Sequence, residues 1–147
     1  MINSASWKDP ELTPTPIGRR SSITLPAIAG QIGTARQFVA RLIDDPALAS
    51  DAVLCLSEVA TNAIVHSNSR RPGGQFTVSA ERYGDGRIRV EVEDGGGRWM
   101  ERVKAEGQHL GLMIVSQLAA AWGSQSDGHG RTVWFELGPV PGSPPAA

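Results

Sequence analysis

Residues 75–94 read QFTVSAERYGDGRIRVEVED, and this stretch decides the fold class. Apolar and polar residues alternate over 75–83 and again over 87–94, which is typical of strands that bury one face. The intervening Gly84-Asp85-Gly86 is a turn sequence that favours a β-hairpin. Because two strands follow each other with no helical crossover between them, the stretch predicts antiparallel pairing within an α+β domain.

The flanking sequence supplies the other predicted elements. Asp44, Asp45 and Pro46 end one helix and begin the next, and Gly123 is expected to cap a third helix. The sequence predicts strands at 21–27 (SSITLPA) and 131–137 (RTVWFEL), and helices at 31–43, from 46 to the loop RRPGG, and 107–122. These elements predict an α/β sandwich with a mixed, mostly antiparallel sheet and helices on one face.

Length and composition predict one domain between two tails. The chain has 147 residues, 40% of them hydrophobic and 20% charged, which suits a single core. Seven of the ten prolines lie in the first 16 or the last nine residues, where little can be buried. We therefore expect disordered tails at 1–20 and 139–147 and a folded domain over 21–138.

The net charge and the hydropathy of the chain indicate its expected partners and cellular location. A formal net charge of −1 gives no general attraction to nucleic acid or to an anionic membrane. The sequence shows neither a signal peptide nor a run of ~18 apolar residues, so we expect a cytoplasmic protein without a membrane span. The single cysteine, Cys55, lies between two leucines and is expected to be a core residue.

Residues 54–67, LCLSEVATNAIVHS, form part of the predicted second helix and carry polar residues four positions apart. Glu58, Asn62 and His66 would therefore lie on nearly one side of the helix. A solvated helix face and a functional row of side chains both fit this pattern.

Two glycine-rich stretches follow. Asp94 ends a predicted strand and precedes Gly95-Gly96-Gly97, which fits either a turn or a backbone that approaches a ligand closely. The hairpin context excludes a Rossmann dinucleotide site. Gly107 and Gly111 surround a predicted helix start, a place that favours an anion such as phosphate but where glycine is also common without one.

The order of these stretches resembles the ATP-binding domain of the GHKL superfamily, with its Bergerat-type fold. The resemblance covers residues 21–138: a helix with Glu and Asn, a strand ending in Asp-x-Gly, a glycine-rich loop into a helix, and Gly-Arg-Thr opening a strand. Within the superfamily the chain is similar to the short anti-sigma-factor serine kinases of the RsbW type.

The resemblance implies roles for the helix residues. Glu58 matches the general base toward a substrate hydroxyl or water, and Asn62 matches the ligand of a Mg²⁺ ion that bridges the phosphates of ATP. A carboxylate and an amide oxygen suit these two tasks. His66 matches a position that we interpret as structural.

The resemblance also implies a nucleotide-binding set. Asp94 matches the acceptor for the adenine amine, Gly96 allows the base to approach, and Thr132 matches a threonine near the adenine. The phosphate-binding loop corresponds to Gly107, His109, Leu110 and Gly111. Arg98 and His109 replace glycines of the family pattern, and the intervening segment, with Arg98 and Lys104, is short for an ATP lid.

The function implied is a Mg²⁺-ATP-dependent serine/threonine kinase that phosphorylates an antagonist protein and binds a sigma factor, with a homodimer as an option. The alternative is a non-catalytic module that binds a regulator, with ATP structural or absent; His109 and the short lid favour it, whereas Glu58 favours the kinase. A two-component histidine kinase is disfavoured because no phosphoacceptor helix pair is visible.

Overall fold

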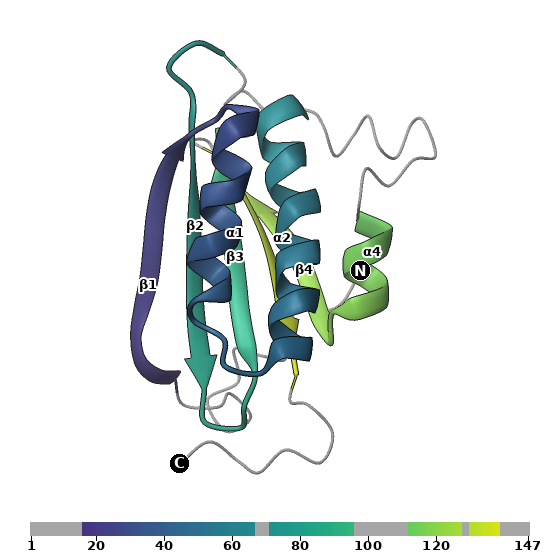
Figure 1. The fold of residues 1–147 in the computed structure, drawn as a ribbon. Helices are drawn as coiled ribbons and strands as arrows, with labels where there is room; N and C mark the ends of the chain where they lie inside the picture. Colours follow the sequence, from purple (N-terminus) through teal and green to yellow (C-terminus); the bar gives the residue numbers. More distant parts are fainter. Residues whose placement is uncertain (1–15, 67–70, 96–111, 128–129, 139–147) are drawn as a thin grey trace.

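The protein folds around one five-stranded sheet. The computed structural model describes residues 16–66, 71–95, 112–127 and 130–138. The strand order is β1-β2-β3-β5-β4, and every neighbouring pair is antiparallel (Figure 1). The strands are β1 (Pro16–Pro26), β2 (Gln75–Tyr83), β3 (Ile88–Asp94), β4 (Ala121–Ser126) and β5 (Arg131–Leu137).

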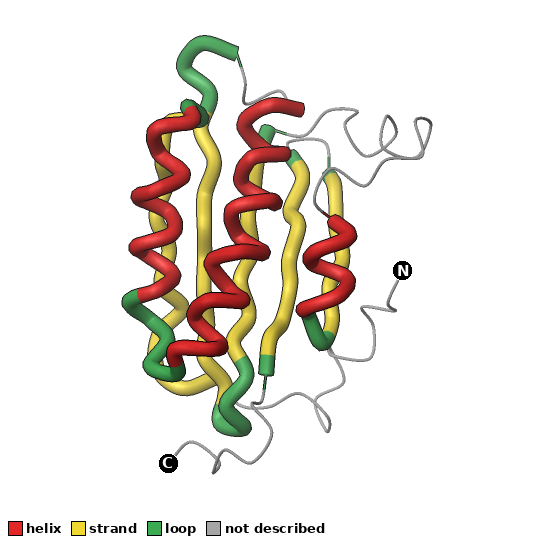
Figure 2. Tube along the Cα trace, turned by 45° about the vertical axis from the view of Figure 1, so that its right-hand side comes forward, coloured by secondary structure: helices red, strands yellow, loops and turns green. Residues whose placement is uncertain are grey.

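All the helices in the described residues lie on the same face of this sheet (Figure 2). They are the 3-10 helix η2 (Ala29–Gln31) and the α-helices α1 (Ile32–Ala40), α2 (Pro46–His66) and α4 (Leu112–Leu118). We call this side the helix-covered face and the other side the open face. The predicted α+β sandwich with helices on one face is confirmed, and the described sheet is wholly antiparallel where a mixed one was expected.

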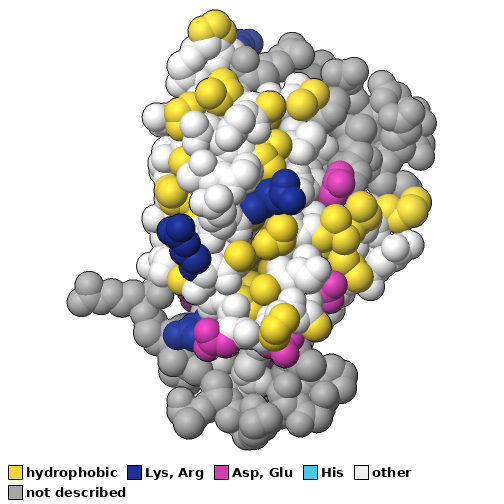
Figure 3. Space-filling view, in the orientation of Figure 1, with side chains coloured by type: hydrophobic (Ala, Val, Ile, Leu, Met, Phe, Trp, Pro, Cys, Tyr) yellow, Lys and Arg dark blue, Asp and Glu magenta, His cyan; other side chains and the backbone are white. Residues whose placement is uncertain are grey.

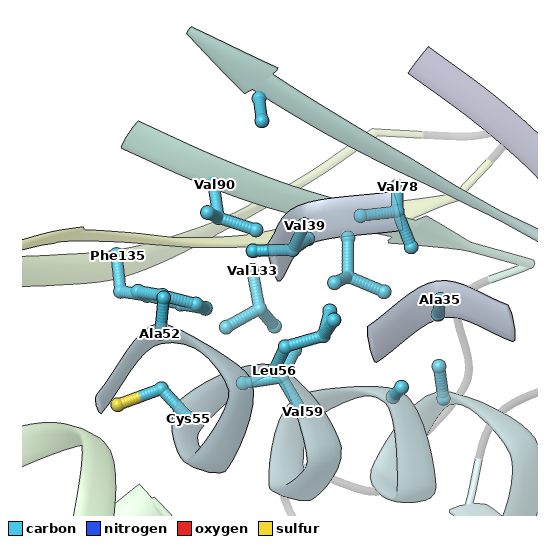
Figure 4. Close-up of a cluster of buried hydrophobic side chains, with 14 of the residues drawn as sticks. Ala35, Val39, Ala52, Cys55, Leu56, Val59, Val78, Val90, Val133 and Phe135 are labelled. Atoms are coloured by element: carbon cyan, nitrogen blue, oxygen red, sulfur yellow. The ribbon is translucent and has the colours of Figure 1, made fainter. Parts of the chain in front are cut away.

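The core fills the space between the helices and the sheet. Valines and Phe135 from the strands meet alanines, Cys55 and Leu56 from α1 and α2 (Figure 4). Cys55 is fully buried, as expected, and burial, followed by the nearby Asp51 charge, raises the pKa of its thiol to about 12. A thiol that stays protonated at neutral pH is a packing residue and not a nucleophile.

The long helix α2 begins as the sequence predicts. The Asp45 carboxylate accepts a hydrogen bond of 2.7 Å from the Leu48 N–H, and Pro46 occupies the first helical position, where no N–H is needed. Residues 46–65 are long and apolar enough to span a membrane by length and composition, which was not expected from the sequence. The fold explains why these residues are apolar, because one side of α2 packs on the sheet in the core.

The prediction for Gly123 is wrong. The third helix ends at Leu118, and Gly123 lies inside β4. The Ala119 N–H still donates to the Val115 carbonyl, as in a helix, but the next N–H, that of Ala120, donates to Glu136 on β5 over 2.8 Å. The alanine-rich stretch favours a helix locally, and the open edge of β5 overrides that preference by offering strand hydrogen bonds.

The predicted domain start is five residues too late. β1 begins at Pro16, so residues 16–20 belong to the sheet and not to the tail. Arg20 connects this part of β1 to the neighbouring strands, because its guanidinium binds Glu81 on β2 and Glu91 on β3 at 3.0 and 2.7 Å. The rest of the two predicted tails lies outside the described residues.

Candidate functional site

Burial along α2 runs against the polarity of its side chains. Asn62 is only 3% exposed, whereas Leu54 and Val65 on the same helix are 45% and 47% exposed. A solvated polar face would show the opposite pattern, since a buried amide must regain the hydrogen bonds that it loses from water. Asn62 meets this requirement in part, because it is not without a partner in the structure. The interpretation of the polar row as an ordinary solvated face is therefore wrong for Asn62.

Glu58 lies one turn before Asn62 on α2 and is half-buried. A carboxylate in this position is accessible from one side while the helix holds its backbone rigidly. His66 is the last residue of α2, and its side chain is not among those described. The helix thus places Glu58 and Asn62 on neighbouring turns of one side, as their spacing predicts.

A second buried polar group lies at the end of β3. Asp94 is 6% exposed and closes the strand just before the glycine-rich stretch. The core valines Val90 and Val92 precede it with the alternation of a strand, so Asp94 shares their helix-covered face. Among the described residues, Asn62 and Asp94 are the buried polar side chains on the helix-covered side of the domain, because Ser79, Arg89 and Glu136 alternate onto the open face.

The fold brings these two elements to one end of the molecule. The C-terminal halves of α2 and β3 run toward the same end, which is uppermost in Figure 1. The start of β5 reaches this end as well, because it pairs with the end of β3. A buried carboxylate from the sheet and a buried amide from the helix therefore lie toward the same end of the domain.

The strand register places Thr132 on the open face of the sheet. Thr132 stands opposite Glu93 on β3 and Gln125 on β4, so all three lie on the open face. Asp94 stands opposite Arg131, on the helix-covered face. Thr132 and Asp94 thus lie on opposite sides of the sheet, and Arg131 is the neighbour of Asp94. The signal was present in the sequence, because Arg131 shares its parity with the apolar Val133 and Phe135.

Gly130 fixes how closely the start of β5 approaches Asp94. A Cβ added at Gly130 would lie 2.4 Å from the Asp94 carbonyl oxygen, a distance that side chains do not tolerate. Only glycine permits this approach of two backbones. The glycine before Arg131 therefore allows the two strands to come this close at the candidate site.

Several predicted residues lie outside the described part of the chain. They are Gly96, Arg98, Lys104, Gly107, His109, Leu110 and Gly111. The helix expected to start near Gly107 starts in the described structure at Leu112. The predicted phosphate loop thus remains a prediction.

Two hollows lie along the same end of the sheet, on either side of Glu93. The larger, of about 340 Å³, reaches Asp94 and Gly95 but is otherwise lined from the open face by residues such as Thr24 and Thr77. Neither hollow is lined by Asn62, so we locate the site by the two buried polar groups and not by these hollows. Among the described residues, no group of three or more His, Cys, Asp or Glu side chains could hold a metal.

Comparison with known proteins agrees with this geometry. The family model described as histidine kinase-like ATPase domain matches residues 25–137. No curated protein matches the chain. A crystal structure of the RsbU and RsbW domains of Rv1364c from Mycobacterium tuberculosis superposes with a TM-score of 0.63 at 23% identity. The alignment covers 82% of this chain and 32% of that one, so the chain spans about a third of the length of this neighbour.

The matched region begins at the end of β1 and contains β2, β3, β4 and β5, together with α1, α2 and α4. It includes the buried Asn62, the buried Asp94 and the strand that carries Arg131. The chain therefore belongs to the histidine kinase-like ATPase domain family.

Proposed function

We propose that this protein binds ATP and acts as an anti-sigma-factor serine/threonine kinase, which phosphorylates an antagonist protein and sequesters a sigma factor. The observation that carries the proposal is the burial of Asn62 and Asp94 on α2 and β3, at one end of the domain. The fold shared with part of the structure of the RsbU and RsbW domains of Rv1364c supports the regulatory part. A cytoplasmic location and a homodimer belong to the same proposal.

Each residue has a task that its chemistry fits. Asp94 is an acceptor at a strand end and can receive the amine of a purine. The Asn62 amide oxygen is a hard ligand, suited to a Mg²⁺ ion that keeps most of its other contacts with phosphates and water. When bound, Mg²⁺ would neutralise phosphate charge. Glu58, half-buried one turn away, can accept a proton from a serine or threonine hydroxyl.

A second candidate function rests on the outer surface of the helices. Hydrophobic side chains gather there over α2 and α4 (Figure 3), among them the exposed Leu54, Val65 and Met113. Such a surface suits protein binding. It supports a non-catalytic module that binds a regulator, with ATP as a structural ligand or absent.

Titration calorimetry with ATP, with and without Mg²⁺, tests nucleotide binding directly. Asp94→Asn should weaken binding by about 1.5–3 kcal/mol, the worth of a hydrogen bond to a charged group. Asn62→Ala should remove the part of the affinity that depends on Mg²⁺. Thr132→Ala is a matched control at the same end of the sheet, and it should leave ATP affinity unchanged because Thr132 lies on the open face.

Phosphoryl transfer separates the kinase from the binding module. Glu58→Gln should keep ATP affinity within a few-fold and abolish transfer from labelled ATP to antagonist candidates from the same genome. If the parent transfers no phosphate and Glu58→Gln binds sigma factors equally well, the binding module is the better description. If neither ATP nor Asp94 matters for any binding, the nucleotide proposal fails.

A further inference from the structure

We infer that Arg131 determines which purine base this site accepts, and that it allows guanine to bind beside Asp94 as well as adenine. The inference rests on the proposed nucleotide binding and deepens it, because it concerns the base and not the phosphates. Arg131 was not among the residues that the sequence assigned to the site.

The first argument is the strand register. Arg131 is the direct cross-strand partner of Asp94 in the β3–β5 pair. Side chains directly opposite each other in an antiparallel pair lie on one face, with Cβ atoms about 4.5–5.5 Å apart. A cation therefore starts next to the buried carboxylate, on the face that carries the candidate site.

The second argument is that both groups are held there. Gly130 brings the β5 backbone against the Asp94 carbonyl, which fixes the separation of the two strands at this point. Arg131 is half-buried, and its Nη1 atom is shielded from solvent. Both residues take part in interactions in the structure. The guanidinium is thus partly drawn into the protein, whereas an arginine at a strand end commonly extends into water.

The third argument is the hydrogen-bonding capacity of the pair. An ionised carboxylate offers only acceptors, and a guanidinium offers only donors. A carboxylate alone suits the amine of adenine and repels the carbonyl oxygen that guanine has in the same position. A donor and an acceptor side by side remove this discrimination: the guanine carbonyl can accept from Arg131, while its ring N–H donates to Asp94.

Adenine remains a ligand of the same pair. Its amine donates to Asp94, and the neighbouring ring nitrogen can accept from Arg131. Both bases therefore find a complete set of partners, so the site has no buried group that one base would leave unpaired. Unpaired polar groups are the main source of strong discrimination between similar ligands. We expect weak selectivity between ATP and GTP.

The test compares ATP and GTP affinities of the full chain by calorimetry, in the parent and in Arg131→Met, which has no hydrogen-bond donor in its side chain. The parent should bind the two nucleotides within about tenfold of each other, since no partner is lost with either base. Arg131→Met should weaken GTP by at least about tenfold, because the guanine carbonyl would then face only the Asp94 carboxylate. It should weaken ATP by less than about threefold, because the adenine amine keeps its bond to Asp94 and only the contact to the ring nitrogen is lost.

Two further variants control for charge and folding. Arg82→Gln removes an arginine at the opposite, hairpin end of β2, where it lies 4.0 Å from Asp44, and should leave both affinities unchanged. Arg131→Lys keeps a cationic donor and should retain GTP binding better than Arg131→Met does. If Arg131→Met does not fold, the ratio of ATP to GTP affinity in the parent and the affinities of the lysine variant still test the inference.

Three outcomes would overturn the role of Arg131 or the nucleotide binding on which it rests. A parent that prefers ATP by more than about a hundredfold overturns the role of Arg131, because the pair would then discriminate as a lone carboxylate does. Equal weakening of ATP and GTP by Arg131→Met also overturns it, since the arginine would then act on phosphates or on folding. Failure of the parent to bind either nucleotide overturns the proposed nucleotide binding itself, and this inference with it.

Discussion

The two faces of the sheet are buried by different chemistry, and β5 shows both. On the helix-covered face, Val133 and Phe135 pack into an apolar core with α1 and α2. On the open face, Trp134 and Glu136 are equally buried, at 1% and 3% exposure, although no helix of the described residues covers them. All residues of β5 from 133 to 137 are therefore buried, so its sequence does not show the alternation of burial that one-sided strands have.

An ionic network replaces the apolar core on the open face. The carboxylates and guanidiniums of this network come from four strands and the β2–β3 turn, and their N–O distances are 2.7–3.1 Å. The members are Arg20, Glu81, Asp85, Arg87, Arg89, Glu91 and Glu136. The Arg89 guanidinium also lies over the Trp134 ring, 4.2 Å from its centre. Each buried charge in the network thus has an opposite charge within hydrogen-bond reach.

This difference teaches that equal burial does not mean equal energetics. The helix-covered face gains stability from apolar area removed from water. The open face gains little from burial itself, because desolvation of the charges offsets their attraction, but it loses much if one partner is removed. The two faces should therefore respond differently to substitution and to pH.

Removal of a core ring should give the largest effect. Phe135→Ala should lower the free energy of unfolding by about 4 kcal/mol, through lost transfer energy and the cavity that remains. Urea unfolding measures it, with Leu54→Ala as the control on exposed α2 surface, for which we expect less than about 0.5 kcal/mol. A small loss for Phe135→Ala would mean that the helices do not pack on this face as described.

Breaking the ionic network from one side should cost somewhat less. Glu136→Leu removes the carboxylate that Arg87 and the buried Arg89 both contact at 3.1 Å. Arg89 then keeps its ion pair with Glu91 but loses that with Glu136, and the variant should be destabilised by about 3 kcal/mol. The double variant Arg89→Met with Glu136→Leu removes both charges and should recover most of that loss. If the double variant is as unstable as the sum of its single variants, burial on the open face depends on the charges themselves.

The open face should also show a dependence on acidic pH. Burial raises the pKa of Glu91, but hydrogen bonds from Arg20 and Arg89 outweigh it and hold the pKa below its ordinary value. A lowered pKa gives stability that is present above the ordinary carboxyl value and is lost as the pH falls through the folded-state value. Glu91→Gln should therefore cost about 1.5–3 kcal/mol at pH 7.

That cost should shrink in acid. Urea unfolding of the parent and of Glu91→Gln at pH 7 and at pH 3 gives the comparison, because below the ordinary carboxyl pKa the unfolded parent takes up a proton at Glu91 and the stability that the charge gives decreases. A difference that stays constant between the two pH values contradicts the role of the Glu91 charge.

The smallest effect concerns the packing of Trp134 on β4. A Cβ at Gly123 would lie 3.0 Å from the nearest atom of the Trp134 ring, so the indole would have to shift by a few tenths of an ångström. Gly123→Ala should destabilise by about 1 kcal/mol and change the near-ultraviolet circular dichroism. Gly33→Ala on α1, where an added Cβ meets nothing within 4 Å, is the control and should not destabilise.

The sequence by itself determined the elements whose local pattern and tertiary environment agree. The hairpin strands β2 and β3 lie where the alternating pattern predicted them, and α2 begins at the predicted Asp45-Pro46 cap. β5 was predicted at its observed bounds. The spacing of Glu58 and Asn62 also placed both on one side of α2, because helical geometry alone fixes which residues are neighbours.

Only the tertiary structure decided the features that depend on distant partners. β4 forms because β5 offers an unpaired edge to a stretch that would otherwise remain helical, and β1 extends to Pro16 through strand pairing. The burial of Asn62 showed that the polar row of α2 is not an ordinary solvated face at this position. Arg131, and not Thr132, faces Asp94, because the register of two strands far apart in the sequence sets which side chains meet, and a shift by one residue would exchange the faces.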